Sequence, residues 1–235
     1  MLKLDTTSSI KAELVEKYKN GEFRILGGGN EKQQTKTIEI QNAHFLADKD
    51  YIIREPNYNY ANREIEWYKS MSLNVNDIPG GAPKMWLACA TENGFINSNY
   101  GWMIWSEDNY SQYEYCLNKL IKDPHTREAC MIYQRPSMQI EYNKDGMHDF
   151  CCTWSVQCFI NEDKNGKKHL KYIVNMRSND AIFGYCNDII WHKYVQAELA
   201  NDLSYYFKEE IICDTIEWNA GSLHVYERHF KYLEE

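Results

Sequence analysis

Two alternating segments joined by a polar turn are the feature that most constrains the fold of this chain. Residues 153–160 and 169–176 alternate in the manner of strands, and Asn165-Gly166 lies in the polar stretch between them. A period of two is typical of strands that bury one face, and Asn-Gly favours a tight turn between two strands. We therefore predict two consecutive strands of a sheet here.

The rest of the chain contains helical and strand patterns without a regular alternation. Apolar residues at helical spacing predict four helices, further alternating segments predict three strands, and glycine- or proline-rich stretches predict loops. This order favours an α+β fold over a doubly wound α/β fold. The helices are expected from the cap Ser9 to Gly21, at 57–72, from Asp108 to Asp123-Pro124 and around 191–199, the strands at 37–40, 131–142 and 223–230, and the loops at 27–34 and 76–83.

Length and charge limit the classes of function. A chain of 235 residues can bury a full core, and we expect one domain over residues 1–235. The net charge of −8 argues against a general nucleic-acid binder, because such proteins need a basic face. No stable nucleic-acid binding is expected, and a bound phosphate should belong to a small molecule.

The eight cysteines are expected to be reduced thiols. The N-terminal residues MLKLDTTSS lack the apolar core of a secretion signal, so we predict a cytoplasmic protein. The cysteines form no paired C-x-x-C pattern, and no metal site is predicted. No apolar run approaches the ~20 residues that a membrane-spanning helix needs, so no membrane association is expected.

The stretch DFCCTWSVQ at 149–157 contains a candidate nucleophile. A thiolate is the strongest common protein nucleophile near neutral pH, and a fixed cation nearby keeps a thiol ionised. Arg177 and Ser178 follow about 25 residues after Cys152, and a guanidinium beside a hydroxyl suits a phosphate. The pattern predicts covalent chemistry on a phosphorylated substrate.

An aromatic and amide cluster is a candidate ligand surface. Trp86, Trp102 and Trp105 surround the segment 97–101, which contains Tyr100. Core or loop packing is the default interpretation of such a cluster. Flat ring walls also suit a heteroaromatic ligand.

Several blocks, taken together, resemble the thymidylate synthase family and, more closely, its phage branch of deoxycytidylate hydroxymethylases. The resemblance covers roughly residues 35–230. The blocks are REIEWYKS at 63–70, INSNYGWMIWSEDNY at 96–110, QRPSMQIEYNKDGMHDF at 134–150, NMRSNDAIFGYCND at 175–188 and GSLHVYERHF at 221–230.

The resemblance implies a fold, a co-substrate and a nucleophile. Members have a mixed or antiparallel sheet packed with helices, and one sheet face forms the interface of a homodimer. A cysteine attacks carbon 6 of a pyrimidine nucleotide, and carbon 5 takes a one-carbon unit from 5,10-methylenetetrahydrofolate. Cys152 matches the nucleophile by its place before Thr153 and ahead of Gln157. Cys151 is the rival, and strand alternation is expected to turn it to the opposite face.

The phosphate-binding residues are also implied by the resemblance. Arg177 and Ser178 match the family's phosphate pair, and Asn179 and Asp180 follow them as candidate substrate ligands. Family members contribute arginines from the region after the Asp-Pro loop to the partner subunit's phosphate. Arg127 fits this role here, but Glu128 occupies the place of the usual second arginine, so Lys32 is a candidate replacement.

The remaining residues match parts of the site that surround the base and the sugar. Glu64 matches the glutamate that organises water and assists proton transfer. His224 and Tyr226 match the H-x-Y pair that binds a sugar hydroxyl, and alternation places both on one strand face. Trp86 and Tyr100 are the candidates for contact with the folate.

Asp188 is the candidate reader of the base. Thymidylate synthases carry an asparagine there, which suits uracil, whereas a carboxylate accepts a hydrogen bond from the amino group of cytosine. A proton shared with the ring nitrogen would also offset the charge that builds when the thiolate adds. Asn187 is the alternative reader, but the spacing from Gly184 favours Asp188. Deoxycytidylate (dCMP) is therefore the expected substrate.

The fate of the one-carbon unit leaves alternatives open. Thr153 stands where thymidylate synthases have a histidine, and the sequence stops soon after the last predicted strand. Both features favour a site that admits water, and hence a hydroxymethyl product. The alternatives are a hydroxymethylase or thymidylate synthase acting on deoxyuridylate (dUMP), and a catalytically weak homologue that binds nucleotides or RNA.

Overall fold

The computed structural model describes residues 4–27 and 34–234. The protein forms two compact units, and each unit combines segments that are far apart in the sequence. The strand β6 (Lys168–Met176) and the helix α7 (Gly184–Phe207) each contribute residues to both units. The single domain expected over residues 1–235 stays a prediction. The first unit comprises Met1–Pro56, Ile173–Tyr194 and Thr215–Glu235, and the second comprises Asn57–Tyr172 and Val195–Asp214.

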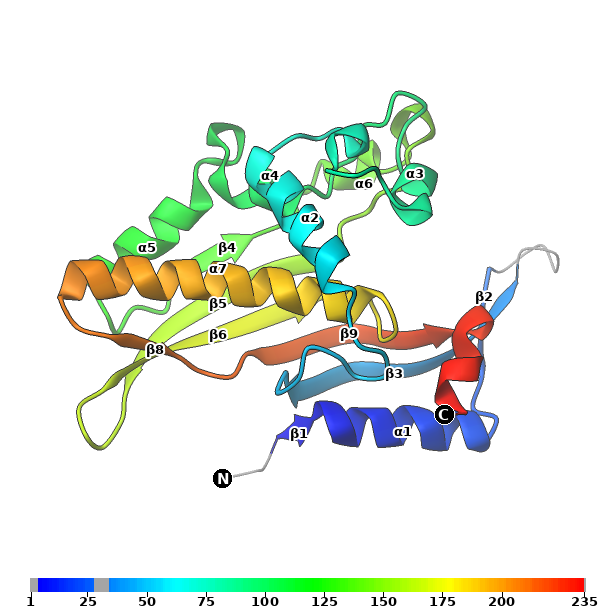
Figure 1. The fold of residues 1–235 in the computed structure, drawn as a ribbon, viewed down its shortest axis with the longest axis horizontal. Helices are drawn as coiled ribbons and strands as arrows, with labels where there is room; N and C mark the ends of the chain where they lie inside the picture. Colours follow the sequence, from blue (N-terminus) through cyan, green and yellow to red (C-terminus); the bar gives the residue numbers. More distant parts are fainter. Residues whose placement is uncertain (1–3, 28–33, 235) are drawn as a thin grey trace. The chain divides into compact units, whose positions relative to one another are not determined.

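The first unit is built around two long paired strands (Figure 1). β3 (Thr35–Leu46) runs antiparallel to β9 (Glu217–Tyr226), and β9 runs parallel to residues 173–176 of β6. α1 lies along β3. β1 pairs in parallel with β3, β2 pairs antiparallel with β3, and β7 pairs in parallel with β9. The bounds of these shorter elements are β1 (Asp5–Thr6), α1 (Thr7–Lys19), β2 (Arg24–Leu26), β7 (Asn179–Asp180) and the 3-10 helix η5 (Glu227–Leu233).

The side chains that β3 buries change parity along the strand. Ile38 and Ile40 are buried before Asn42, and Ala43 and Phe45 are buried after it. Asn42 adopts a φ of 57°, which is in the left-handed region that asparagine tolerates better than most residues. The left-handed conformation of Asn42 therefore accompanies the change from even-numbered to odd-numbered buried apolar residues. The segments before and after Asn42 both bury apolar side chains.

The first helix confirms the predicted periodicity but begins earlier than expected. Thr6, not Ser9, is the N-cap, and its side chain accepts a hydrogen bond from the Ser9 main chain. Ser9 Oγ in turn accepts from the Thr6 main-chain N–H at 2.7 Å. This reciprocal capping box satisfies two main-chain donors, so the helix starts at the residue that allows both bonds.

Aromatic side chains form much of the core of the first unit. Tyr185 on α7 lies 5.1 Å from the ring of Trp218 and 5.8 Å from that of Phe45, measured between centroids. All three side chains are fully buried. The Tyr185 hydroxyl donates to the Lys49 carbonyl at 2.9 Å, so the polar end of this buried ring has a partner. This packing holds the first turns of α7 in place.

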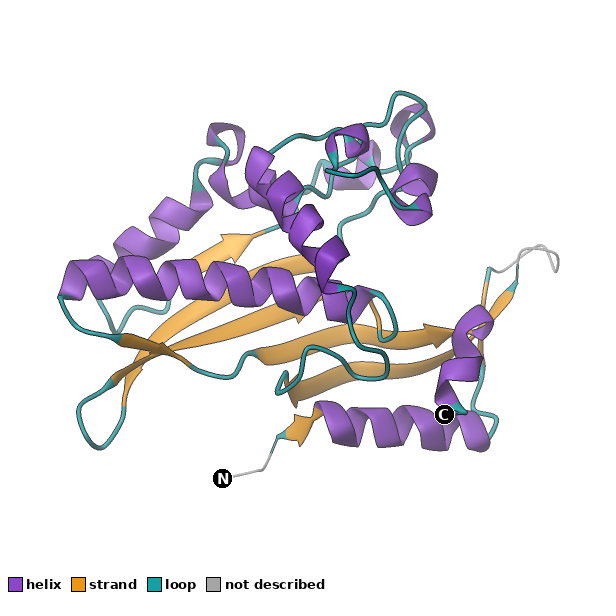
Figure 2. Ribbon diagram, viewed as in Figure 1, coloured by secondary structure: helices purple, strands orange, loops and turns teal. Residues whose placement is uncertain are grey.

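The second unit combines short helices with strands (Figure 2). β5 runs antiparallel to β4, and it is also a neighbour of β6. β8 runs parallel to the start of β6. In the last half of α7, Gln196 Nε2 donates to the carbonyls of Leu170 and Asp214 at 3.1 and 2.9 Å. The elements are α2 (Tyr58–Ser70), η2 (Val75–Asp77), α3 (Lys84–Cys89), α4 (Tyr100–Trp105), η3 (Glu107–Asn109), α5 (Gln112–Lys122), β4 (Cys130–Ile132), α6 (Met138–Glu141), η4 (Lys144–Gly146), β5 (Thr153–Glu162) and β8 (Ile211–Cys213).

The strand predicted at 131–142 is largely wrong. β4 ends at Ile132, and residues 138–141 form α6. Pro136 has no N–H for a sheet ladder, and the Met138 N–H donates to the Arg135 carbonyl at 3.1 Å, which begins a helical turn. The alternating pattern predicted too long a strand, because the pattern of apolar residues does not show that Pro136 lacks a main-chain N–H.

Two other predicted boundaries are also wrong. The last strand ends at Tyr226 instead of Phe230, because residues 227–233 form η5, where Phe230 packs 5.3 Å from Tyr18 and 5.5 Å from Phe23. The helix expected from Asp108 begins at Gln112, after Tyr110, which has a φ of 62° and an 80% exposed side chain.

The expected fold class is confirmed. Helices pack with a mixed sheet that contains both parallel and antiparallel strand pairs. The two predicted strands around Asn165-Gly166 are β5 and β6, and Gly166 at the turn has a φ of 78°. Within the described part of the chain, no helix combines the length and apolar character required to cross a bilayer.

Candidate active site

A buried carboxyl group on α2 is the centre of a hydrogen-bonded cluster in the second unit. Glu64 is 6% exposed and accepts hydrogen bonds from the Tyr60 hydroxyl and from Trp86 Nε1, the latter at 2.7 Å. Trp86 Nε1 also lies 3.1 Å from the Tyr60 oxygen. Burial raises the pKa of the Glu64 carboxyl, although both hydrogen bonds favour the ionised form. A carboxyl group whose pKa is raised in this way is suited to proton transfer.

The candidate nucleophile and its neighbouring thiol differ in exposure. Cys151 is fully buried, and its Sγ donates to the Thr153 carbonyl at 3.2 Å. Cys152 is partly exposed. Both residues precede the first residue of β5, so the expected strand alternation does not apply to them. The difference in burial distinguishes the two thiols instead. Cys152 is the thiol that a ligand can reach.

Asp149 holds the main chain in front of Cys152. The N–H groups of Asn97 and Ser98 each donate to Asp149 Oδ2 at 2.7 Å, and Ser98 Oγ donates to Asp149 Oδ1 at 2.7 Å. Asn97 Nδ2 also donates to the Asp149 carbonyl at 3.1 Å. Asp149 is 7% exposed, so these bonds form away from solvent. They fix the chain three residues before the candidate nucleophile.

The segment that binds Asp149 is itself anchored to α2. Asn99 is fully buried, and its Nδ2 donates to the carbonyls of Trp67 and Ser72 at 3.0 and 2.9 Å. At Gly101, a Cβ would lie 1.9 Å from the Tyr68 carbonyl oxygen, so only glycine permits this approach of α4 to α2. The same contact therefore supports the Glu64 helix and the segment that orients Asp149.

The two residues predicted to bind the folate differ in their surroundings. Trp86 is partly exposed, and its ring lies 5.3 Å from that of Trp67. Tyr100 is 5% exposed, stacks on Tyr68 at 5.2 Å and meets the edge of Tyr133 at 5.2 Å. Trp86 thus offers a partly open indole beside Glu64, whereas Tyr100 packs within the core.

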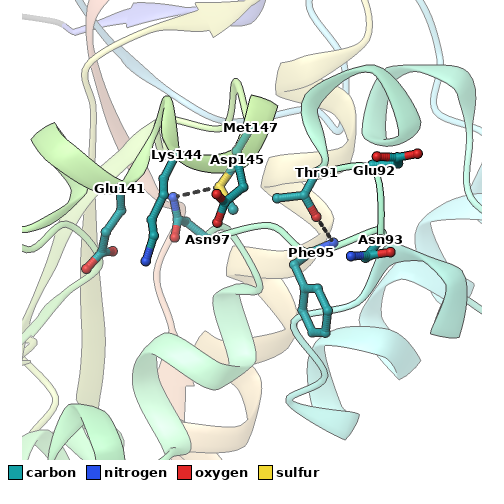
Figure 3. Close-up of a pocket in the computed structure, with 9 residues that line it drawn as sticks. All are labelled: Thr91, Glu92, Asn93, Phe95, Asn97, Glu141, Lys144, Asp145 and Met147. Atoms are coloured by element: carbon teal, nitrogen blue, oxygen red, sulfur yellow. Dashed lines mark hydrogen bonds between the residues drawn. The ribbon is translucent and has the colours of Figure 1, made fainter.

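A hollow of about 600 Å³ is lined in part by Asn97, one of the residues that bind Asp149 (Figure 3). Asn97 Nδ2 donates to Met147 Sδ at 3.1 Å on its wall. The predicted site residues are not among its lining residues, which are Thr91, Glu92, Asn93, Phe95, Asn97, Glu141, Lys144, Asp145 and Met147.

In the first unit, Asp188 occupies the second turn of α7. Asn179 Nδ2 donates to Asp188 Oδ2 at 2.8 Å, and Asn179 is 2% exposed. Gly184 lies against this pair, since a Cβ there would be 3.4 Å from Asn179 Nδ2. Asn187 Nδ2 donates to the Phe183 carbonyl of its own helix at 3.1 Å. The structure thus gives Asp188 an orienting donor and ties Asn187 to the helix.

The predicted phosphate and sugar residues meet at β9. The Ser222 N–H donates to the Arg177 carbonyl at 3.1 Å, and Asp180 pairs with His224 in a parallel register. Ser178 lies between Arg177 and the short strand β7. Residues that are more than 40 positions apart in the sequence are therefore adjacent in the first unit.

His224 and Tyr226, which the alternation placed on one strand face, have adjacent rings on β9. Their ring centroids lie 4.7 Å apart at an interplanar angle of 79°. His224 is 6% exposed, and burial lowers the pKa of its imidazole, although the charge of Asp180 opposes the shift. The imidazole is neutral at pH 7 and has one donor and one acceptor nitrogen.

Of the two cationic residues expected to complete the phosphate site, the structure describes Arg127. Arg127 is exposed and belongs to the second unit, where its carbonyl accepts a hydrogen bond from Gln157 Nε2 at 2.9 Å. Glu128 forms an ion pair with Lys119. Lys32 lies outside the described residues.

Comparison with known proteins decides the family. Residues 17–235 match the family described as thymidylate synthase. The chain belongs to the thymidylate synthase family. The deoxycytidylate 5-hydroxymethyltransferases of Enterobacteria phage T4 and Enterobacteria phage T2 are each 52% identical to it over 201 residues, which cover 85% of this chain and 80% of those proteins.

A solved structure shows the same fold. The thermostable thymidylate synthase A from Bacillus subtilis matches with a TM-score of 0.67 and 20% identity, and the match covers 97% of this chain and 83% of that one. The family resemblance and the thymidylate synthase-like fold are thus confirmed. The homodimer and its sheet interface stay predictions.

Several residues of this member of the thymidylate synthase family were not singled out from the sequence. Tyr60 lies four positions before Glu64 on a predicted helix, and that spacing is a usable signal. Asp149 and its partners Asn97 and Ser98 are about 50 residues apart, so no local pattern indicates this contact.

Proposed function

We propose that this enzyme transfers a one-carbon unit from 5,10-methylenetetrahydrofolate to carbon 5 of dCMP and adds water, giving 5-hydroxymethyl-dCMP for modified phage DNA. The observation that carries the proposal is the 52% identity to the phage T4 hydroxymethyltransferase over 85% of the chain. The carboxylate at Asp188, in place of the asparagine of thymidylate synthases, supports cytosine as the base.

Cys152 is the proposed nucleophile. Its thiolate adds to carbon 6 of the pyrimidine, which makes carbon 5 nucleophilic. Its partial exposure and the buried state of Cys151 support this assignment. Asp188 accepts from the cytosine amino group and shares a proton with the ring nitrogen, so the charge that the addition creates is offset at the base. The Asn179 amide donates to Asp188 Oδ2 at 2.8 Å, which supports an oriented carboxyl group at this position.

Glu64 is the proposed proton-transfer group. Burial raises the pKa of its carboxyl, so the group can carry a proton at a higher pH than an exposed glutamate. Loss of the carbon 5 proton to a base and breakage of the bond to the folate nitrogen would leave an exocyclic methylene group on the ring, and Glu64 orients the water that adds to it. Departure of Cys152 from carbon 6 then restores the aromatic ring and frees the enzyme.

Methylenetetrahydrofolate supplies the one-carbon unit when it is bound. The chemistry of the residues around Glu64 fits a flat heteroaromatic group, because Trp86 combines a partly exposed ring with an indole N–H fixed on the carboxyl. Tyr100 supports this region from within the core.

The remaining roles follow the same proposal. Arg177 and Ser178 bind the phosphate, with Asp180 as a neighbouring ligand of the nucleotide. His224 and Tyr226 bind the sugar hydroxyl. The enzyme acts as a homodimer in the cytoplasm of the host cell, and Arg127 of each subunit reaches the phosphate held by the other, with Lys32 as a further cation.

The test is mass spectrometry of the nucleotides after incubation with methylenetetrahydrofolate and equal amounts of dCMP and dUMP. We expect one hydroxymethyl group on dCMP alone. Cys152→Ala should abolish the product, and Cys151→Ala is the matched control that should retain it. A methyl or hydroxymethyl product on dUMP would contradict the role of Asp188, and nucleotide or RNA binding without any product would indicate a catalytically weak homologue.

A further inference from the structure

The phenol of Tyr60 belongs to the hydrogen-bonded cluster around Glu64 in the second unit. Tyr60 and Glu64 are four residues apart on α2, so their side chains lie on one face of the helix. The Tyr60 hydroxyl contacts Glu64 Oε1. Trp86 Nε1 on α3 lies 2.7 Å from the same oxygen and 3.1 Å from the Tyr60 oxygen. Two polar groups therefore meet at one oxygen of the carboxyl group.

The number of available protons decides the direction of these bonds. An indole nitrogen can only donate, so Trp86 Nε1 donates to Glu64 Oε1 and to the Tyr60 oxygen. A phenol has one proton, and Trp86 offers no acceptor for it, so Tyr60 donates to Glu64 Oε1. Burial and the charge of Glu64 raise the pKa of the Tyr60 phenol, although Trp86 and the charge of Arg63 oppose the shift. Tyr60 therefore keeps its proton and is a fixed donor, not a proton relay.

The two oxygens of the Glu64 carboxyl group are thereby unequal. Oε1 receives the phenol and the indole, whereas no group among the described residues donates to Oε2. A proton added at Oε1 would meet two hydrogens that already point at this oxygen, so the carboxyl group takes up a proton at Oε2. Oε2 is likewise the oxygen whose lone pairs are left to bind water.

Tyr60 is held in place by contacts that do not involve Glu64. The Asn57 side chain caps α2 and accepts from the Tyr60 main-chain N–H at 3.2 Å. The Arg63 guanidinium lies over the Tyr60 ring, 5.6 Å from its centroid, and Arg63 Nη1 donates to the Pro79 carbonyl at 2.8 Å. These contacts fix the ring whether or not the carboxyl group is ionised.

The groups that face Glu64 act on its ionisation in opposite directions. Burial raises the pKa of the carboxyl, and the hydrogen bonds from Tyr60 on α2 and Trp86 on α3 lower it. Burial has the largest effect, so the pKa stays above its ordinary value. Loss of the Tyr60 hydroxyl should raise the pKa further, because the ionised carboxylate then loses one of its two donors.

We propose that Tyr60 is a positioning residue whose hydroxyl holds Glu64 Oε1, so that Oε2 binds the reacting water and accepts its proton. This role rests on the proposed function, because it takes Glu64 to be the group that orients that water. The water oxygen bonds to the methylene carbon, and the π electrons of the exocyclic bond form the double bond between carbons 5 and 6. The Cys152 sulfur leaves with the electron pair of its bond, and one water proton passes to Oε2.

The first experiment measures the Glu64 pKa without any substrate. Carbon-13 NMR of ligand-free protein labelled at the glutamate carboxyl carbons follows the titration, and Glu64→Gln identifies the signal. Tyr60→Phe should raise the Glu64 pKa by about one pH unit, the effect of one hydrogen bond to a charged group. Difluorotyrosine in place of Tyr60 has the same shape and is a stronger donor, so it should lower the Glu64 pKa.

Tyr115→Phe is the matched control for the NMR titration. It removes the same hydroxyl from a side chain on α5 that is 66% exposed and belongs to the same unit. The Glu64 pKa should stay unchanged in this variant. An unchanged Glu64 pKa in Tyr60→Phe, or an equal rise in the control, would overturn the inference.

The second experiment follows kcat for hydroxymethylation of dCMP against pH. Glu64 must be ionised to accept the water proton, so kcat should fall as the pH drops through the Glu64 pKa. Tyr60→Phe should move this acid limb to higher pH and lower the plateau by roughly 10- to 100-fold. The KM values for dCMP and methylenetetrahydrofolate should stay within about twofold, because the hydroxyl acts on the reacting water and not on binding. Tyr115→Phe should leave the limb and the plateau unchanged.

The outcomes distinguish this inference from the proposed function. An unmoved acid limb together with raised KM values in Tyr60→Phe would show a merely structural role and would overturn the inference. If the unmodified enzyme makes no hydroxymethyl product from dCMP, the proposed function fails, while the NMR titration still decides whether Tyr60 acts on Glu64.

Discussion

Replacement of Asp149 by alanine should both destabilise the protein and displace the candidate nucleophile Cys152. The carboxylate receives three donors, namely the N–H groups of Asn97 and Ser98 and the Ser98 hydroxyl, each at 2.7 Å. All three residues are buried, so water cannot replace the lost acceptor. The substitution leaves three buried donors without this partner.

The magnitude follows from these contacts. A buried donor that loses its acceptor costs about 1–3 kcal/mol, so Asp149→Ala should lower the free energy of unfolding by roughly 3–6 kcal/mol after partial relaxation. Asp149→Asn should cost roughly 1–2 kcal/mol, because its carbonyl oxygen still accepts both N–H groups and its amide donates to the Ser98 hydroxyl. A larger loss of unfolding free energy in Asp149→Ala than in Asp149→Asn would thus indicate that hydrogen bonding is the cause.

Urea unfolding at equilibrium measures the stability. The position of the Cys152 thiol is measured by its rate of alkylation with iodoacetamide, which peptide mass spectrometry follows. Asp145→Asn is the matched control, since Asp145 is an exposed carboxylate four positions earlier in the same segment. Both Asp149 variants should change the alkylation rate, and the control should not. A loss of less than 1 kcal/mol in Asp149→Ala would refute the reasoning, because that is below the cost of one buried donor.

Three other perturbations have defined outcomes. Asp188→Asn should raise kcat/KM for dUMP relative to dCMP by on the order of 10²- to 10⁴-fold, and an unchanged ratio would exclude Asp188 as the base reader. Burial lowers the pKa of His192 from 6.5 to about 3. The unfolded chain therefore binds the proton first, and stability should fall by up to about 1.4 kcal/mol per pH unit below 6.5, a slope that urea titrations should find reduced in His192→Gln. Gly101→Ala should cost roughly 3 kcal/mol in thermal unfolding, because its Cβ would meet the Tyr68 carbonyl at 1.9 Å, and a cost below 1 kcal/mol would show that α4 shifts freely.

Elements defined by local patterns agree with the structure. The alternation on either side of Asn165-Gly166 predicted β5 and β6, and helical spacing predicted α2 at 58–70 and the middle of α7. These patterns succeed because a strand or helix that buries one face must repeat its apolar residues with the period of its backbone. The errors at 131–142 and 223–230 arose where a missing main-chain donor or a distant aromatic contact outweighed the local pattern.

The sequence by itself determined the family and the fold class and proposed the candidate site residues, because identities and spacings such as Arg177-Ser178 and His224-x-Tyr226 can be recognised along the chain. Only the tertiary structure decided the burial, the pKa and the hydrogen-bond partners of those side chains. Burial raises the pKa of Glu64 and lowers that of His224, and the Asn179 amide donates to Asp188. Each of these effects depends on the distance to a partner or to solvent, and folding sets those distances by joining segments that the sequence keeps far apart.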